Sequence, residues 1–136
     1  CFGAVSLVWH PTKYAQMLGE KLREHGSKVW LVNTGWTGGK YGVGHRMKLS
    51  YTRAMVNAAT AGGLDSVETR PDPFFGLHIP VEVPGVPAEV LDPRSTWANP
   101  AEYDEQARIL AGMFRENFTK FEKDVSDAVK QAGPTG

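Results

Sequence analysis

The sequence contains only one cysteine, Cys1, in 136 residues, so no disulfide can form within the chain. This excludes a small scaffold held together by disulfides. The sequence also lacks a run of about 20 apolar residues and a basic-then-apolar segment of the kind that directs secretion. We therefore expect a cytosolic protein without a membrane span. The chain starts at cysteine rather than methionine and is apolar from the start, from which we expect a piece of a longer protein.

Acidic residues are missing from one long stretch, although the whole chain has 15 basic and 15 acidic residues. Between His25 and Leu64 there is no Asp or Glu, and five basic side chains give the segment a charge of +5. These are Lys28, Lys40, Arg46, Lys48 and Arg53. An anionic ligand can bind here without repulsion from acidic groups, although chance clustering of the bases would give the same pattern. Nucleic acid is not expected as a partner, because five dispersed cations are too few to follow its backbone.

Complete motifs for metal binding, phosphate binding or nucleophilic catalysis are also missing. The four histidines have no ligand spacing among them, so we predict no metal site. Gly39 and Gly44 have the spacing of the glycines in a P-loop, but His45-Arg46 stands where Lys-Ser/Thr is required. The hydroxyl residues near the bases, Thr34, Ser50 and Thr52, lack the companion His and acid of a catalytic triad, so their expected role is capping.

A glycine-rich segment is the most distinctive feature that the sequence does have. Five glycines fall between Gly35 and Gly44, with Trp36 and Tyr41 beside them. A ligand-contacting loop and a structural glycine turn both fit this pattern, and the basic, acid-free surroundings favour a ligand.

A helix is predicted directly after the glycines. Ser50 is a good N-cap for a helix over residues 51–60, and Gly62-Gly63 is typical of a helix end.

The order of the predicted elements indicates an α/β fold. Short apolar runs at Val5–Val8 and Lys28–Asn33 predict buried strands, and a helix is expected between them, from His10-Pro11 to Gly26. A strand, helix, strand order is typical of an α/β unit.

The C-terminal half is expected to change character twice. Residues 71–100 hold seven of the nine prolines, which favours extended segments and turns. Asn99-Pro100-Ala101-Glu102 then combines an N-cap, a proline at the first helical position and a glutamate at the third. We expect a long C-terminal helix from there to about Lys123 or as far as Gly133-Pro134.

Several short strings occur along the chain in an order that is specific to one enzyme family. They are Cys1-Phe-Gly-Ala4, His10-Pro11, Leu31-Val-Asn-Thr-Gly-Trp36, Gly42-Val-Gly44, Thr52-Arg-Ala54, Pro84-Gly-Val-Pro87 and Leu91-Asp-Pro-Arg94. Together they resemble the C-terminal part of ATP-dependent phosphoenolpyruvate carboxykinase over almost the whole chain.

The resemblance implies an enzyme of gluconeogenesis that converts oxaloacetate and ATP to phosphoenolpyruvate, ADP and CO₂, with Mg²⁺ and Mn²⁺ at the phosphates. Residues 1–136 would then be the C-terminal part of its nucleotide-binding (carboxykinase) domain, without an internal boundary. Its mixed sheet would continue into the remainder of the chain. The family's phosphate loop, metal ligands and oxaloacetate-binding arginines lie upstream of this segment, so the 136 residues alone should be inactive.

The resemblance also implies three binding residues. In the family an arginine after the glycine loop, the apolar residue next to it and the threonine of the Thr-Arg-Ala string contact the adenine nucleotide. Here these are Arg46, Met47 and Thr52. A guanidinium can lie against a purine or bind phosphate, and a methionine offers a soft apolar wall. A non-catalytic nucleotide- or anion-binding module and a purely structural subdomain are the alternative interpretations.

Overall fold

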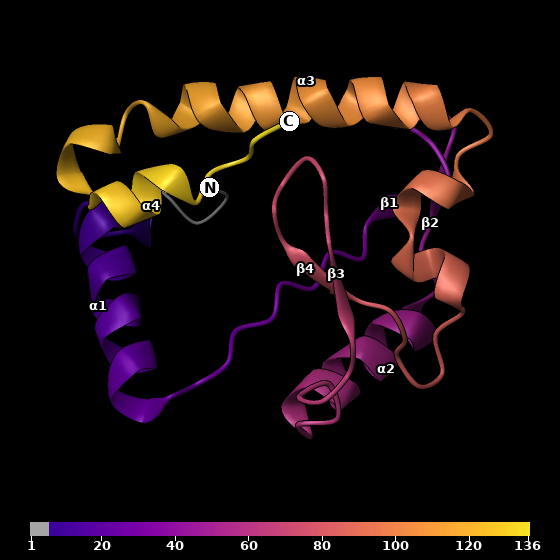
Figure 1. The fold of residues 1–136 in the computed structure, drawn as a ribbon, viewed down its shortest axis with the longest axis horizontal. Helices are drawn as coiled ribbons and strands as arrows, with labels where there is room; N and C mark the ends of the chain where they lie inside the picture. The colour runs from indigo at the N-terminus through magenta and orange to yellow at the C-terminus, as the bar shows by residue number, and fades with distance from the viewer. Residues whose placement is uncertain (1–5) are drawn as a thin grey trace.

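The structure, a computed structural model, describes residues 6–136, in which helices alternate with two small antiparallel strand pairs. The order is α1 (Pro11–His25), β1 (Trp36–Thr37), β2 (His45–Arg46), α2 (Leu49–Thr60), β3 (Thr69–Pro71), β4 (His78–Pro80), η2 (Ala88–Leu91), η3 (Pro93–Thr96), α3 (Pro100–Phe118), η4 (Glu122–Asp124) and α4 (Asp127–Gln131). The helix α3 lies along one edge, α1 and α2 lie on two other sides, and the β3–β4 hairpin lies between them (Figure 1). The predicted mixture of helix and strand is confirmed at this level.

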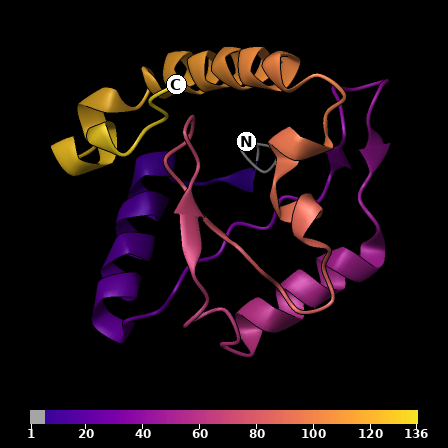
Figure 2. The ribbon, with the colours of Figure 1, turned by 45° about the vertical axis from the view of Figure 1, so that its right-hand side comes forward.

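The helix α1 begins and ends where its sequence predicts. Pro11 occupies the start of the helix, and Gly26 ends it with a left-handed φ of 62° that glycine adopts without steric cost. The ring of His10 packs edge-on against Phe121, with 5.9 Å between centroids, so the start of α1 lies beside the turn that follows α3. Figures 1 and 2 both show α1 joined to the rest by one extended segment.

The strand predicted at Lys28–Asn33 does not form within the described residues. The segment is extended, but within the described residues it pairs with neither hairpin. Val29 is 57% exposed and Leu31 is 76% exposed. A strand needs the N–H and C=O groups of a neighbour, and residues 6–136 place no partner strand beside this segment.

The other predicted strand, Val5–Val8, is also absent over the residues that the structure describes, 6–8. Val5 lies outside the described residues, as does Cys1. Val8 belongs to no strand and is 89% exposed. An apolar run alone therefore did not specify a strand at either place.

The helix α2 starts earlier than its sequence suggests. It begins at Leu49, so Ser50 is already inside the helix, and Lys48 takes the cap position without a side-chain cap bond. The end is as predicted, because Gly62 N–H donates to Ala59 O at 3.3 Å and Gly63 N–H to Ala58 O at 2.9 Å. These two bonds form a Schellman motif, which satisfies carbonyls at the helix end.

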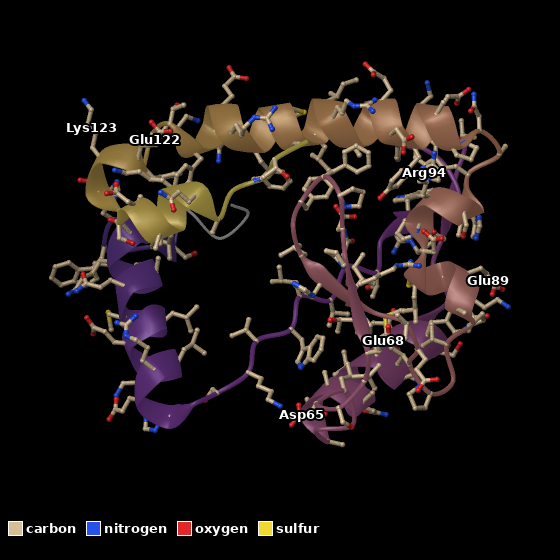
Figure 3. All side chains as sticks on the ribbon, in the orientation of Figure 1. Asp65, Glu68, Glu89, Arg94, Glu122 and Lys123 are labelled. Atoms are coloured by element: carbon tan, nitrogen blue, oxygen red, sulfur yellow. The ribbon has the colours of Figure 1, made fainter. Side chains whose placement is uncertain are left out.

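The start of α3 is confirmed in atomic detail. The Asn99 side chain accepts a hydrogen bond from the N–H of Ala101 at 3.1 Å, and its amide donates to Glu102 at 3.2 Å. The helix has 19 residues and ends at Phe118, before the Lys123 or Gly133 of the prediction. The chain then turns through η4 into α4, and Glu122 and Lys123 point outwards at this corner (Figure 3).

The apolar core is small for a chain of this size. One cluster, Leu64, Val83 and Leu91, lies between α2 and the proline-rich segment, and Ala107 and Ala111 of α3 are also buried. The accessible surface is 10048 Å² for a mass of 14.9 kDa. A folded monomer of that mass exposes about 7,000 Å². The excess indicates apolar faces that this chain does not cover itself.

No helix in residues 6–136 has the length and apolar character needed to cross a bilayer.

Candidate functional site

The glycine-rich segment forms a tight β-hairpin. Trp36 of β1 pairs with Arg46 of β2, and Thr37 pairs with His45. The N–H of Met47 donates to the carbonyl of Gly35 at 3.0 Å, which continues the pairing past β2. The hairpin thus fixes the backbone of Arg46, one of the three predicted nucleotide-binding residues.

Close approach of the two hairpin strands explains why glycine is needed here. A Cβ atom on Gly44 would lie 2.5 Å from the carbonyl oxygen of Gly39 and 2.6 Å from that of Thr37. No side chain fits such a space without moving the backbone. Gly42 at the tip has open space around it, but its φ of 88° is left-handed. The glycines therefore have a structural role, whatever else the loop binds.

The three predicted binding residues lie within one strand-to-helix junction. Arg46 ends β2, Met47 follows it, and Thr52 lies in the first turn of α2. Arg46 is exposed, whereas Met47 and Thr52 are half-buried. Within the described part of the chain, no hydrogen bond joins the side chains of Arg46 and Thr52. Their role as a set of nucleotide contacts stays a prediction.

The basic side chains near this junction differ in whether the described residues pair them. Lys28 is paired, with its Nζ atom 2.9 Å from Asp65 Oδ2, beyond the acid-free segment (Figure 3). Within residues 6–136, Arg46 and Arg53 make no ion pair with an acidic side chain. Lys48 Nζ lies 5.6 Å from the centre of the Tyr51 ring, a cation–π distance.

A large apolar cavity opens beside the junction. It has a volume of 430 Å³, and Met47 lies in its wall. Other lining residues are Trp30, Trp36, Trp97, Met55 and Leu110. No charged side chain of the described residues lines the cavity, so it does not suit phosphates. It suits the flat apolar face of a base, or apolar side chains from the rest of a longer protein.

Trp36 and Tyr41, whose rings could stack on a planar ligand or anchor the loop, contact each other. Their rings pack edge to face, with 5.5 Å between centroids and 74° between planes. Tyr41 is largely exposed at the loop, while Trp36 also lines the cavity. Loop anchoring, the alternative role, therefore accounts for the contact that the structure contains.

Thr96 is a residue of this site that the sequence did not reveal. Its Oγ1 atom accepts a hydrogen bond from the N–H of Gly38 at 3.2 Å, across 58 positions in sequence. It also lies 3.4 Å from the Oγ1 atom of Thr37. No motif or spacing connects a proline-rich segment to the base of a hairpin at such a separation.

The titratable groups with shifted pKa values belong to η3, which also carries Thr96, and to the start of α3. Two hydrogen bonds from Arg94, at 2.8 and 3.0 Å, lower the pKa of Asp104 and raise that of Arg94. Burial raises the pKa of Tyr103, whose ring packs against Trp97. These shifts reflect packing of η3 on α3.

Metal ligands are not assembled in the described residues. Across positions 6–136 no group of three or more His, Cys, Asp or Glu side chains is placed to hold an ion. The residues present do not fit Mg²⁺ or Mn²⁺, which need several oxygen ligands. No step of a reaction is assigned to a metal on this chain.

Comparison with known proteins gives one consistent family. The sequence model of phosphoenolpyruvate carboxykinase matches residues 1–89. The chain is 56% identical over 134 residues to phosphoenolpyruvate carboxykinase (ATP) of Thermus thermophilus, covering 98% of this chain and 25% of that protein. It is 59% identical over 133 residues to the enzyme of the same name from Lysinibacillus sphaericus, again covering 98% and 25%. The chain spans about a quarter of the length of these relatives.

Proposed function

The chain belongs to the ATP-dependent phosphoenolpyruvate carboxykinase family, and from that premise we propose that it contributes the adenine end of an ATP site. The whole enzyme would convert oxaloacetate and ATP to phosphoenolpyruvate, ADP and CO₂ in the cytoplasm, as a step of gluconeogenesis. The observation that carries the proposal is the junction after the glycine hairpin. There an exposed, unpaired arginine, a cavity-lining methionine and a half-buried threonine follow one another within seven positions.

Each of the three residues has a definite task in this proposal. The guanidinium of Arg46 lies against the purine or binds phosphate, because no acidic side chain of the described residues neutralises it. Met47 forms an apolar wall at the mouth of the cavity, where the base is removed from water. Thr52 exchanges a hydrogen bond with the nucleotide from the first turn of α2. Together they bind and orient ATP and carry out no bond-making step.

In this proposal, the rest of the enzyme supplies the strands that pair with residues 28–33. Residues 28–33 present exposed apolar side chains, and within the described residues they pair with no strand, which is the pattern of an internal strand that lacks its neighbours. We place this segment in a mixed sheet whose other strands come from the other three quarters of the enzyme. The same packing would close part of the 430 Å³ cavity and leave its hairpin side for the base. Residues 1–136 are then the C-terminal part of the nucleotide-binding domain.

The test is the Michaelis constant for ATP in the full-length enzyme with Arg46→Ala. Losing one charge-assisted or stacking contact costs about 1 to 3 kcal/mol, which raises that constant roughly 5- to 150-fold. The constant for oxaloacetate should change little. Thr52→Val should act in the same direction but more weakly, because only one neutral hydrogen bond is lost.

Arg53→Ala is the matched control. Arg53 carries the same charge one residue along α2 from Thr52 and is exposed, and consecutive helical side chains do not face the same way. Its replacement should leave saturation by ATP unchanged. If Arg46→Ala had no effect, or if Arg53→Ala impaired ATP binding equally, a specific contact by Arg46 would be ruled out.

A further inference from the structure

The hydroxyl of Thr96 joins the proline-rich segment to the base of the glycine hairpin. It donates to the carbonyl of Pro93 at 2.7 Å and accepts from the N–H of Gly38 at 3.2 Å. Since its only proton is used on Pro93, the 3.4 Å contact with Thr37 requires the Thr37 hydroxyl to donate. One side chain thus makes hydrogen bonds to two segments of the chain that are far apart in sequence.

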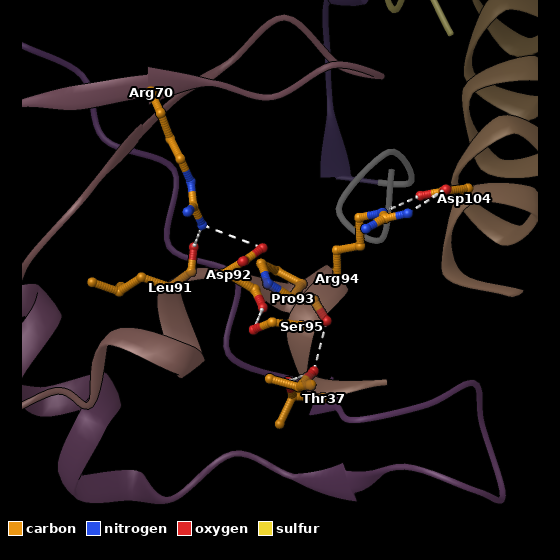
Figure 4. A network of polar contacts seen from close by, with 9 residues as sticks. Thr37, Arg70, Leu91, Asp92, Pro93, Arg94, Ser95 and Asp104 are labelled. Atoms are coloured by element: carbon orange, nitrogen blue, oxygen red, sulfur yellow. Dashed lines mark hydrogen bonds and ion pairs between the residues drawn. The ribbon is translucent and has the colours of Figure 1, made fainter. Parts of the chain in front are cut away.

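The Thr96 side of this link is held rigidly. The fork of Arg94, two residues earlier, makes two hydrogen bonds to Asp104 of α3 (Figure 4). Arg70 of β3 donates to the carbonyl of Leu91 at 2.7 Å and lies 3.4 Å from Asp92 Oδ1. The turn that carries Thr96 is therefore fixed both to the long helix and to the β3–β4 hairpin.

The hairpin side of the link lies next to Arg46. Thr37 is the neighbour of Trp36, and Trp36 pairs directly with Arg46 across the hairpin. A side chain at Gly38 would be strained, because its φ of 75° is left-handed and a Cβ atom there would lie 3.0 Å from the ring of His45. A ladder of two residue pairs does little by itself to fix the position of the hairpin.

We propose that Thr96 is a positioning residue for the nucleotide site, which holds the base of the glycine hairpin so that Arg46 meets ATP. This inference rests on the proposed role of Arg46 in binding ATP. Thr96 itself touches no nucleotide. Its hydroxyl acts through the backbone of the hairpin, by reducing the range of orientations that Arg46 samples before ATP binds.

The experiment compares Thr96→Val, Thr96→Ser and Ser95→Ala in the full-length enzyme. Valine keeps the shape and removes the hydroxyl, so the Michaelis constant for ATP should rise roughly 2- to 10-fold, as expected for the loss of one or two neutral hydrogen bonds. The Michaelis constant for oxaloacetate should stay within about twofold of the wild-type value, because no hydrogen bond at the oxaloacetate site is lost. Serine restores the hydroxyl and should restore the ATP constant.

Ser95→Ala is the control for loss of a hydroxyl in the same turn. The Ser95 hydroxyl donates only to the carbonyl of Asp92, at 2.8 Å, and does not reach the hairpin. Its loss should leave both Michaelis constants unchanged. Amide hydrogen exchange gives a second readout that does not depend on ATP: the Gly38 N–H should exchange faster in Thr96→Val and should be protected again in Thr96→Ser.

Comparison with Arg46→Ala separates this inference from the proposed function. In an Arg46→Ala background, Thr96→Val should raise the ATP constant no further, because both changes act on one contact. If Arg46→Ala weakened ATP saturation and Thr96→Val did not, the inference would be overturned and the proposed function would stand. Additive effects in the double variant would also overturn it. If Arg46→Ala left ATP saturation unchanged, the proposed function would fail and the inference with it.

Discussion

A methyl group added at Gly44 is the sharpest perturbation of the hairpin that the structure offers. In Gly44→Ala the new Cβ atom would lie 2.5 Å from Gly39 O and 2.6 Å from Thr37 O, well inside contact distance. Both obstacles are backbone atoms, so no side chain can rotate away. The strands of the hairpin must separate.

The cost follows from the bonds that separation breaks. The Thr37–His45 pairing, the Met47 N–H bond to Gly35 and the Gly38 N–H bond to Thr96 all depend on the present geometry. At about 0.5 to 1.5 kcal/mol for each net hydrogen bond, their loss destabilises the closed hairpin by about 2 to 4 kcal/mol. Arg46 would then lose its fixed position, and ATP saturation should weaken in the full-length enzyme.

Gly42→Ala is the matched control for that experiment. Nothing lies within 4 Å of a Cβ atom at Gly42, so only its left-handed φ of 88° opposes the change. That conformation costs about 1 to 2 kcal/mol for a residue with a side chain. Hydrogen exchange of the hairpin amides should therefore accelerate much more in Gly44→Ala than in Gly42→Ala. Equal acceleration, or none in Gly44→Ala, would show that close approach of the two strands does not determine the hairpin.

Three further outcomes are expected. The 136-residue chain alone should show no carboxykinase turnover and at most weak ATP binding, and turnover by the pure chain would contradict this. Its uncovered apolar faces should bind an environment-sensitive dye. Amides of residues 29–33 should be strongly protected from exchange in the full-length enzyme, and rapid exchange there would contradict an internal strand. Arg94 lowers the folded-state pKa of Asp104, so the stabilising effect of this ion pair should be present above the unfolded-state pKa of Asp104 and should be lost as pH falls through the folded-state pKa. The difference in melting temperature between wild type and Asp104→Asn should therefore shrink in acid. A difference that stayed constant with pH would argue against the ion pair.

Features with local causes could be predicted from the sequence. The ends of α1 and the start of α3 depend on a proline, a left-handed glycine and a capping asparagine that act within one turn of the helix. Their positions could therefore be predicted without knowledge of the remaining fold. The end of α3 was not, because the residues after Phe118 continue the apolar pattern while the chain turns away.

Features that depend on distant partners could not be predicted in the same way. The apolar run at residues 28–33 has the composition of a strand, but strand formation requires neighbours that this quarter of the family's length does not supply. The contact of Thr96 with Gly38 spans 58 positions and involves common residue types, so no local pattern marks it. Arg46, Met47 and Thr52 were predicted as binding residues from the family resemblance, and their role in binding stays a prediction.

The most direct test of the central claim is amide hydrogen exchange of the full-length enzyme with and without ATP. If this segment holds the adenine end of the nucleotide, ATP should slow exchange in peptides covering residues 44–53, from the end of the hairpin through the first turn of α2. Peptides from α1, at the opposite side of this chain, should not respond (Figure 1). Protection that omitted residues 44–53 while ATP was bound and turned over would contradict the account.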